Sequence, residues 1–118
     1  MTKFAQGMQG QNAAKEHLVK KGYAILYENY RLRSSEIDII AKDRDYYVFI
    51  EVKYRKGLAY GLPREAVGYY KQKQIIKAAM HYIVKKNLNN SNFRFDVVEI
   101  LEMDGKAYIN HIVDAFHA

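Results

Sequence analysis

The chain has 118 residues, of which 49% are hydrophobic, so it is long enough to form one domain with a buried core over residues 1–118. It contains no cysteine, which excludes disulfides, thiolate catalysis and zinc held by thiolates. No stretch is apolar enough to cross a bilayer, and the first ten residues lack the apolar segment of a secretion signal, so we expect a cytoplasmic protein without a membrane partner.

The positive charge is unevenly distributed along the chain. The net charge is +6 at pH 7, yet residues 1–86 hold 17 Lys or Arg and 8 Asp or Glu, whereas residues 87–118 hold 2 and 5. A basic surface of this kind serves either general solubility or the binding of a polyanion, since lysines and arginines that neutralise phosphates release counterions. Charge alone leaves both roles open.

The first half of the chain predicts a helix followed by three strands. Residues 10–22 carry apolar positions at helical spacing and end at a glycine, which favours a helix. Residues 23–33 are rich in Tyr and aliphatic side chains, and residues 36–41 alternate charged with apolar positions, as strands do. The polar residues 42–45 predict a turn, and residues 46–54 predict a third strand that completes a meander.

The second half predicts a loop, a helix and two strands. Residues 57–63 contain two glycines and a proline, and we expect them to form a mobile flap. Residues 65–86 carry apolar residues three and four positions apart, which predicts a helix. Residues 93–101 and 106–113 predict two strands, joined by an Asp-Gly turn that is typical of a hairpin. The order of elements is therefore helix, three strands, helix, two strands.

The second predicted helix has an apolar side and an aromatic start. Its apolar positions at helical spacing are Ile75, Ile76, Ala79, Met80 and Ile83. Tyr69 and Tyr70 stand beside two lysines near the start, where the rings could stack on an exposed base. Packing of the two rings against the protein is the alternative, and the sequence favours packing.

Charged residues on two neighbouring strands form the strongest candidate site. Alternation places Glu51 and Lys53 on one face of the third strand, about 6.6 Å apart at about 3.3 Å per residue. Asp38 and Glu36 share a face of the preceding strand, and a simple hairpin register brings Asp38 close to Glu51. Two carboxylates that close repel each other unless a cation lies between them or one is protonated. Oxygen ligands of this kind suit Mg²⁺ or Mn²⁺.

A solvated strand face, on which the charges form cross-strand ion pairs, is the alternative interpretation of these residues. Two observations favour a site. Tyr47 and Phe49 continue the face of Glu51, so the charges project from a largely apolar strand, and Asp38 is followed by isoleucines. Charges in such surroundings cost free energy, and a functional role would explain why the chain carries them.

The spacing of these residues resembles the motif of a known nuclease superfamily. An Asp in "SEIDIIAKD", a gap of 12 residues and then Glu-x-Lys in "YYVFIEVKYR" resemble the PD-(D/E)xK motif. Nearly the whole chain is similar to the YraN family of bacterial proteins, which has a restriction-endonuclease-like fold related to Holliday junction resolvases. The similar segments are residues 20–31, 35–41, 48–55, 63–83, 94–100 and 114–116. The resemblance implies an α/β fold with a mixed central sheet flanked by helices.

The resemblance also implies a role for each residue of the motif. Asp38 and Glu51 would ligate Mg²⁺ or Mn²⁺, together with the backbone carbonyl of Val52. Lys53 would orient or activate water and offset the charge that builds on the phosphate. Glu36 would serve as an outer ligand or hold a metal-bound water. The implied activity is hydrolysis of DNA phosphodiesters, with branched or distorted DNA as the substrate.

Polar positions in the two helices complete the comparison with the family. Gln72, in the second helix, stands where relatives carry a polar residue directed at the site, and a solvent-facing role is the alternative. Gln11 replaces the Glu with which the family opens its first helix, so the site lacks a charge and metal affinity should fall. Glu16 cannot replace it, because five residues are about 500° of helix. Ser35 replaces a Gly before Glu36, which should alter only a turn.

Basic residues that flank the motif are candidates for phosphate contacts. They are Arg31, Arg33, Arg55, Lys56, Lys71 and Lys73. The resemblance to junction resolvases suggests a homodimer, since two nicks need two sites. The alternative function is non-catalytic: the chain would bind nucleic acid, or a partner that processes it, while its nuclease centre is weak or idle.

The four histidines are not expected to form a site. His17, His81, His111 and His117 are scattered along the chain, and none shows metal-ligand spacing with a carboxylate. Surface and helix-packing roles are favoured for them. Asp96, in a strand of core residues, is expected to be structural.

Overall fold

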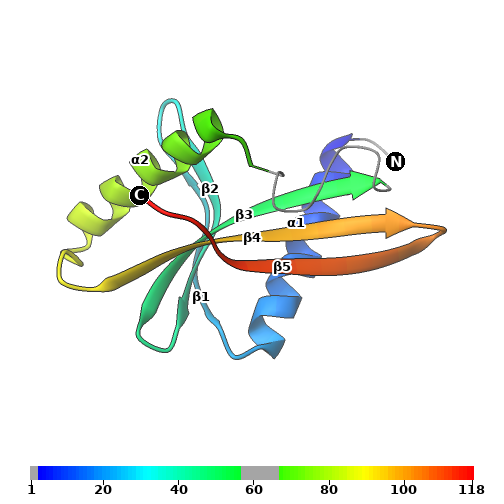
Figure 1. The fold of residues 1–118 in the computed structure, drawn as a ribbon, viewed down its shortest axis with the longest axis horizontal. Coiled ribbons are helices and arrows are strands. Elements are labelled where there is room, and N and C mark those ends of the chain that lie inside the picture. Colours follow the sequence, from blue (N-terminus) through cyan, green and yellow to red (C-terminus); the bar gives the residue numbers. More distant parts are fainter. Residues whose placement is uncertain (1–2, 57–66) are drawn as a thin grey trace.

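A computed structural model describes the backbone of residues 3–56 and 67–118 and the side chains of residues 10–55 and 67–118. Two helices and five strands form in this part of the chain (Figure 1). In chain order they are α1 (Lys3–Lys20), β1 (Ala24–Arg31), β2 (Glu36–Asp43), β3 (Tyr46–Lys56), α2 (Tyr69–Lys85), β4 (Asn92–Met103) and β5 (Lys106–Phe116). The predicted order of elements is confirmed.

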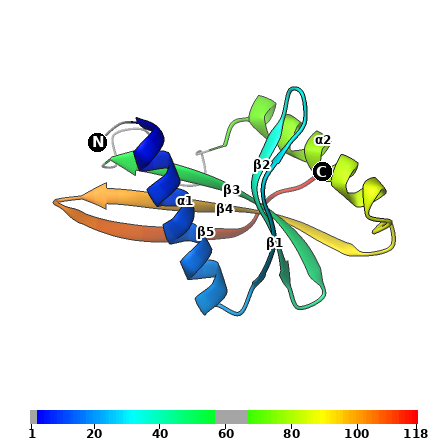
Figure 2. The ribbon, with the colours of Figure 1, turned by 180° about the vertical axis from the view of Figure 1, so that it is seen from behind.

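The five strands form one mixed sheet in the order β1-β2-β3-β4-β5. Neighbouring strands are antiparallel except β3 and β4, which are parallel. A parallel pair needs a long crossover connection, and α2 lies within that connection. The helices lie on opposite faces of the sheet, with α1 behind the strands in Figure 1 and in front of them in Figure 2. The expected α/β architecture, a mixed sheet flanked by helices, is therefore present.

Each face of the sheet buries its own hydrophobic cluster. The cluster under α2 includes Phe49, Ile75, Ala79, Ile83 and Phe95. The cluster under α1 includes Ala14, Leu18, Ile39, Ile50 and Val98. Because alternate residues of a strand point to opposite faces, β3 contributes to both clusters and lies at the centre of the protein.

Both helices begin at residues other than those predicted. α1 begins at Lys3 instead of residue 10, so it runs through two glycines, which weaken a helix without necessarily ending it. α2 begins at Tyr69 instead of residue 65. The flap predicted over residues 57–63 lies outside the described residues. Neither described helix combines the length and the apolarity that crossing a membrane requires.

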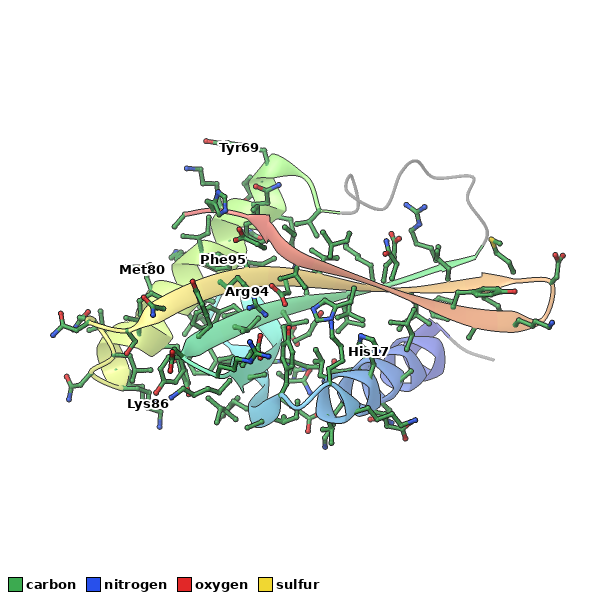
Figure 3. All side chains as sticks on the ribbon, turned by 60° about the horizontal axis from the view of Figure 1, so that its bottom comes forward. His17, Tyr69, Met80, Lys86, Arg94 and Phe95 are labelled. Atoms are coloured by element: carbon green, nitrogen blue, oxygen red, sulfur yellow. The ribbon has the colours of Figure 1, made fainter. Side chains whose placement is uncertain are left out.

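Met80 does not belong to the apolar side of α2. Its side chain is 49% exposed, and Figure 3 shows it on the outer part of the helix. The buried residues of the helix are Ile75, Ala78, Ala79, Tyr82 and Ile83. Each residue advances a helix by about 100°, so Met80 points away from the side that Ala78 and Tyr82 share.

β1 is shorter than the predicted 23–33, but the other four strands run further than predicted, and the hairpin turns are correspondingly short. The polar turn predicted over residues 42–45 shrinks, because Lys42 and Asp43 pair with Tyr47 and Tyr46 in the ladder between β2 and β3. The Asp-Gly turn between β4 and β5 has positive φ at both residues, 51° and 75°. This is the backbone that a two-residue hairpin turn requires.

Gly22 ends α1 with a left-handed backbone, φ 93°. Its N–H donates to the carbonyl of Val19 at 3.0 Å, and the N–H of Tyr23 donates to that of Leu18 at 2.9 Å, which caps the helix. Gly22→Ala should lower the free energy of unfolding by about 1 kcal/mol, measured in urea, since Cβ disfavours this conformation. Gly68→Ala is the matched control, because Gly68 has φ −74° and ample space around it. Equal losses in the two variants would contradict the assignment.

Candidate functional site

The predicted pair of carboxylates lies where β2 and β3 separate. The ladder between these strands ends at the pair Ile39 and Ile50. Beyond it, the side chain of Asp38 replaces a backbone partner, because its Oδ2 accepts a hydrogen bond of 2.8 Å from the backbone N–H of Val52. This bond holds Asp38 against β3, beside Glu51.

Strict alternation along β2 fails at this point, opposite a residue of β1 with a left-handed backbone. Asn29 has a left-handed backbone, φ 55°, and the residues on either side of it pair with Ile37 and Ile39 of β2. Ile39 belongs to the cluster under α1, but Ile37 belongs to the cluster under α2. Alternation predicts one face for both residues, so that prediction is wrong for Ile37. The strand twists through Asp38.

Burial and proximity make the two acids costly to ionise. Glu51 is 6% exposed, and its burial, followed by the charge of Asp38, raises the pKa of Glu51 to about 7. Burial also raises the pKa of Asp38, although the hydrogen bond from Val52 acts in the opposite direction. The charged form of each acid is therefore disfavoured unless a cation lies nearby.

Two lysines from different elements act on the pair. Lys53 follows Glu51 by two residues on β3, and Lys71 lies in the first turn of α2; both side chains are half-buried. Each lysine lowers the pKa of both carboxyls, and the effect of Lys71 is the larger. The sequence indicated Lys71 only as a phosphate contact. Its influence on the acids depends on how α2 packs over the sheet.

Glu36 and Gln72 have neighbours of their own beside the pair. The Glu36 carboxylate lies 3.3 Å from Nε of Arg31 in a surface ion pair, and its charge raises the pKa of both Asp38 and Glu51. The side-chain nitrogen of Gln72 donates to the carbonyl of Val67 at 3.0 Å, so this amide is engaged at the start of α2. The outer-ligand role of Glu36 and the site role of Gln72 stay predictions.

Gln11, which the sequence comparison predicts to replace a helix Glu, is enclosed by the protein. Gln11 is buried in α1, and a Cβ added to Gly10 would lie 3.6 Å from the ring of Tyr54. Glu16 is exposed, as its spacing from Gln11 predicts. Ser35 is buried before the start of β2.

Most of the predicted phosphate contacts lie on the surface. Arg33 is exposed, and the side chain of Arg31 is 69% exposed. Lys73 is exposed, with Nζ 5.1 Å from the centre of the Tyr69 ring. Lys56 is the last residue of β3, and its side chain lies outside the described part of the chain. The surface around the start of α2 and the β1–β2 connection therefore presents basic groups.

Arg55 differs from the other basic candidates because it is 9% exposed. Its Nε lies 3.2 Å from Oε2 of Glu99, a carboxylate without exposed surface. Glu99 stands opposite Lys53 in the parallel ladder of β3 and β4. Arg55 thus forms a buried ion pair, which has a structural role. Its phosphate contact stays a prediction. The sequence signal that could have revealed Glu99 is an acid within a strand of core residues.

The donor set fits a hard divalent cation. No three side chains of His, Cys, Asp or Glu gather into a metal-binding group among residues 10–55 and 67–118. The site offers the carboxylates of Asp38 and Glu51 instead, and the carbonyl of Val52 stays a predicted ligand. Mg²⁺ keeps several waters and is commonly held by one or two carboxylates together with substrate phosphates. Mg²⁺ or Mn²⁺ therefore suits these residues better than a metal that needs a full set of protein ligands.

Tyr69 and Tyr70 do not pack against the protein. They are 73% and 76% exposed, and Figure 3 shows Tyr69 projecting from the start of α2. The packing that the sequence favoured is therefore wrong, since the rings precede the apolar stripe of the helix. They stand next to Lys71, and Lys73 lies over one face of the Tyr69 ring.

Two of the histidines, scattered in the sequence, contact each other in the fold. His17 Nε2 lies 3.3 Å from His111 Nδ1, and His111 Nε2 lies 2.8 Å from Oδ2 of Asp96. His81 has the expected helix-packing role, since its Nδ1 lies 2.6 Å from the hydroxyl of Tyr30 in β1. His17 and His111 are far apart in the sequence, and the packing of α1 against the sheet brings them together.

The sequence profile of the uncharacterised protein family UPF0102 matches residues 10–100, which is most of the chain. The chain belongs to this family. The matched region of the UPF0102 chain includes both candidate carboxylates, Asp38 and Glu51, and both lysines that act on them.

Alignments with other UPF0102 proteins span nearly the whole chain. A relative from Clostridioides difficile strain 630 is 46% identical over 116 residues, which are 98% of this chain and 100% of the relative. One from Trichlorobacter lovleyi is 48% identical over 114 residues, 95% of this chain and 90% of the relative. One from Caldanaerobacter subterraneus subsp. tengcongensis is 40% identical over 119 residues, 98% of each chain.

Proposed function

We propose that this UPF0102 chain is a divalent-metal-dependent nuclease of the PD-(D/E)xK class, with a restriction-endonuclease-like fold, that hydrolyses DNA phosphodiesters. The observation that carries the proposal is the pair formed by the half-buried Asp38 and the buried Glu51 where β2 and β3 separate, with Lys53 beside it. Acids that raise each other's pKa in this way cluster at functional sites, because folding alone does not favour them.

Each residue of the site has a separate task. Asp38 and Glu51, with the carbonyl of Val52, would hold Mg²⁺ or Mn²⁺, and the hydrogen bond to Val52 fixes the Asp38 carboxylate. When bound, such an ion polarises a phosphoryl oxygen and makes water a better nucleophile. Lys53 would orient the attacking water. Lys71 would approach the phosphate from α2 and offset the negative charge that develops during attack.

The charge around the site favours a nucleic acid as the substrate. Arg33 and Lys73 are exposed, and residues 1–86 hold 17 basic against 8 acidic side chains. Contacts of this type bind phosphates and carry no sequence information. The substrate would therefore be recognised by the shape of its backbone, as branched or distorted DNA is. A homodimer would supply the second site for a second nick.

A non-catalytic role is the second candidate. Gln11 brings no charge, and the described residues contain no group of three acids or histidines that could hold a metal by itself. In this alternative the chain binds nucleic acid, or a partner that processes it, without turnover.

A cleavage assay decides between the two functions. The chain is incubated with Mg²⁺ or Mn²⁺ and labelled duplex, single-stranded, flapped or four-way-branched DNA. Cutting should require the metal and fall by about 10²–10³-fold in Asp38→Asn and in Lys53→Ala. Absence of cutting, together with tight and salt-sensitive binding, would support the non-catalytic role.

The matched control for the loss of a lysine is Lys77→Ala. Lys77 is an exposed residue of α2, so this variant removes one positive charge without touching the site. It should cut as well as the unchanged chain. Products that persist in both site variants would come from a contaminating nuclease and would refute the assignment of the site.

A further inference from the structure

A second cluster of polar side chains joins α1 to the last two strands. His17 belongs to α1, Lys21 directly follows its end, Asp96 belongs to β4 and His111 belongs to β5. In Figure 3, His17 lies between α1 and the sheet. The proposed nuclease chemistry uses none of these residues, so the cluster needs an account of its own.

Hydrogen bonding determines which nitrogen of His111 carries the proton. Nε2 faces Oδ2 of Asp96 at 2.8 Å, and Asp96 is a carboxylate without exposed surface that also accepts two bonds from Arg94. Because an ionised carboxylate only accepts, Nε2 of His111 must donate, and Nδ1 therefore holds a lone pair. That lone pair faces Nε2 of His17 at 3.3 Å and Nζ of Lys21 at 3.0 Å.

The separation of the two imidazole nitrogens matches that of two ligands on one metal ion. Nitrogens about 2.0–2.1 Å from a tetrahedral zinc ion lie about 3.3 Å apart. His17 Nε2 and His111 Nδ1 are 3.3 Å apart. A carboxylate on the outer nitrogen, as Asp96 is on His111, is the arrangement that orients metal-ligating histidines.

Lys21 occupies the place that an ion would take. Its ammonium group donates to Nδ1 of His111 in a contact that is exposed to solvent. An exposed lysine side chain can turn outward at little cost, and its departure opens a path to both nitrogens. Binding of the ion would then replace the contact between Lys21 and His111 with two coordinate bonds, one from His17 and one from His111.

We infer that His17 and His111 bind a transition-metal ion of the Zn²⁺ class, with Asp96 as the outer partner of His111 and with water at the remaining positions. Imidazole ligands select such ions over Mg²⁺ or Mn²⁺, which prefer oxygen. The site is therefore separate from the carboxylate pair of Asp38 and Glu51. The ion would link α1 to β5.

Calorimetric titration of the chelator-treated full chain with Zn²⁺ alone tests the inference. One equivalent should bind at the histidine pair, in a step separate from binding at the carboxylate pair, and the melting temperature should rise, since the ion binds the folded chain. His17→Gln should weaken Zn²⁺ binding by more than about 10-fold, because loss of an outer partner alone costs at least that much. The same substitution should abolish the visible absorption of bound Co²⁺. Circular dichroism should show that His17→Gln is folded, because His17 is only half-buried.

Three control variants separate a metal site from a simple hydrogen bond. Lys21→Ala should bind Zn²⁺ more tightly, because no ammonium group competes for Nδ1 of His111. Asp45→Asn should bind Zn²⁺ unchanged, since Asp45 is an exposed turn residue that belongs to neither site. His117→Gln should also bind unchanged, because His117 is exposed and pairs with Asp114 near the end of β5. Failure of the chain to bind Zn²⁺, or equal binding by His17→Gln, would overturn the inference and leave the pair as a contact between α1 and β5.

Discussion

Glu51→Gln should make the metal-free protein more stable at pH 8, although it removes a predicted metal ligand. Glu51 is 6% exposed, and burial with the charge of Asp38 raises its pKa from 4.5 to about 7. Between these two values the folded chain keeps a proton on Glu51 that the unfolded chain releases. The stability that the group contributes is complete below pH 4.5, falls as the pH rises towards 7 and is absent above that value.

The expected gain at pH 8 is about 3 kcal/mol, because each unit of pKa difference corresponds to about 1.4 kcal/mol. Glutamine has nearly the shape of glutamate and stays neutral, so the variant should lose little stability between pH 5 and pH 8. Urea unfolding in the presence of a chelator measures this difference at the two pH values. A variant that is less stable than the unchanged chain at pH 8 would contradict the raised pKa.

Divalent cations supply the complementary test. Mg²⁺ or Mn²⁺ at pH 8 should stabilise the unchanged chain, because a cation between Asp38 and Glu51 favours both charges. The same ions should stabilise Glu51→Gln much less. Glu16→Gln is the matched control, since Glu16 is an exposed glutamate of α1 and its loss should change neither the pH dependence nor the response to metal.

Local patterns were sufficient to predict the elements and most of their faces. The Asp-Gly turn between β4 and β5 and the glycine that ends α1 depend on backbone preferences of a few residues, and both are present. The parallel pairing of β3 with β4 depends on contacts between distant segments, and the family resemblance implied only that the sheet is mixed. The face of Ile37 was missed because strict alternation along β2 fails opposite Asn29, which lies on a different strand.

The features of the candidate site also divide into those that local patterns predict and those that depend on contacts between distant segments. The approach of Asp38 to Glu51 follows from a short hairpin, so the register of two neighbouring strands predicts it. The effect of Lys71 requires α2 to lie over the sheet, and no spacing in the sequence indicates that. The contact of His17 with His111 joins residues 94 positions apart, which alternation and helical periodicity cannot relate.

Asp96→Ala should be among the most destabilising single changes in this chain, at about 3–5 kcal/mol. Asp96 has no exposed surface, and its carboxylate accepts hydrogen bonds from Arg94, from His111 and from the backbone N–H of Asp114. Removal of the acid leaves these donors without their acceptor, and the side chain of Arg94 is only 11% exposed. Arg94 keeps its bond to Asp43, which limits the loss to a part of the network.

The pH dependence of this loss separates the charge of Asp96 from its packing. Burial alone would raise the pKa of Asp96, but hydrogen bonds from His111 and Arg94 outweigh it and hold the pKa below 3.8. The ionised group therefore contributes its full stability above pH 3.8, and the contribution disappears as the pH falls through the lower, folded value. Urea unfolding at pH 7 and pH 3 should show the difference in stability between Asp96→Ala and the unchanged chain shrinking in acid.

Asp45→Ala, at an exposed turn position, should cost less than about 0.5 kcal/mol at both pH values. A loss for Asp96→Ala that is the same at both pH values would mean that the cavity, and not the charge network between α1, β4 and β5, determines the stability of this part of the fold.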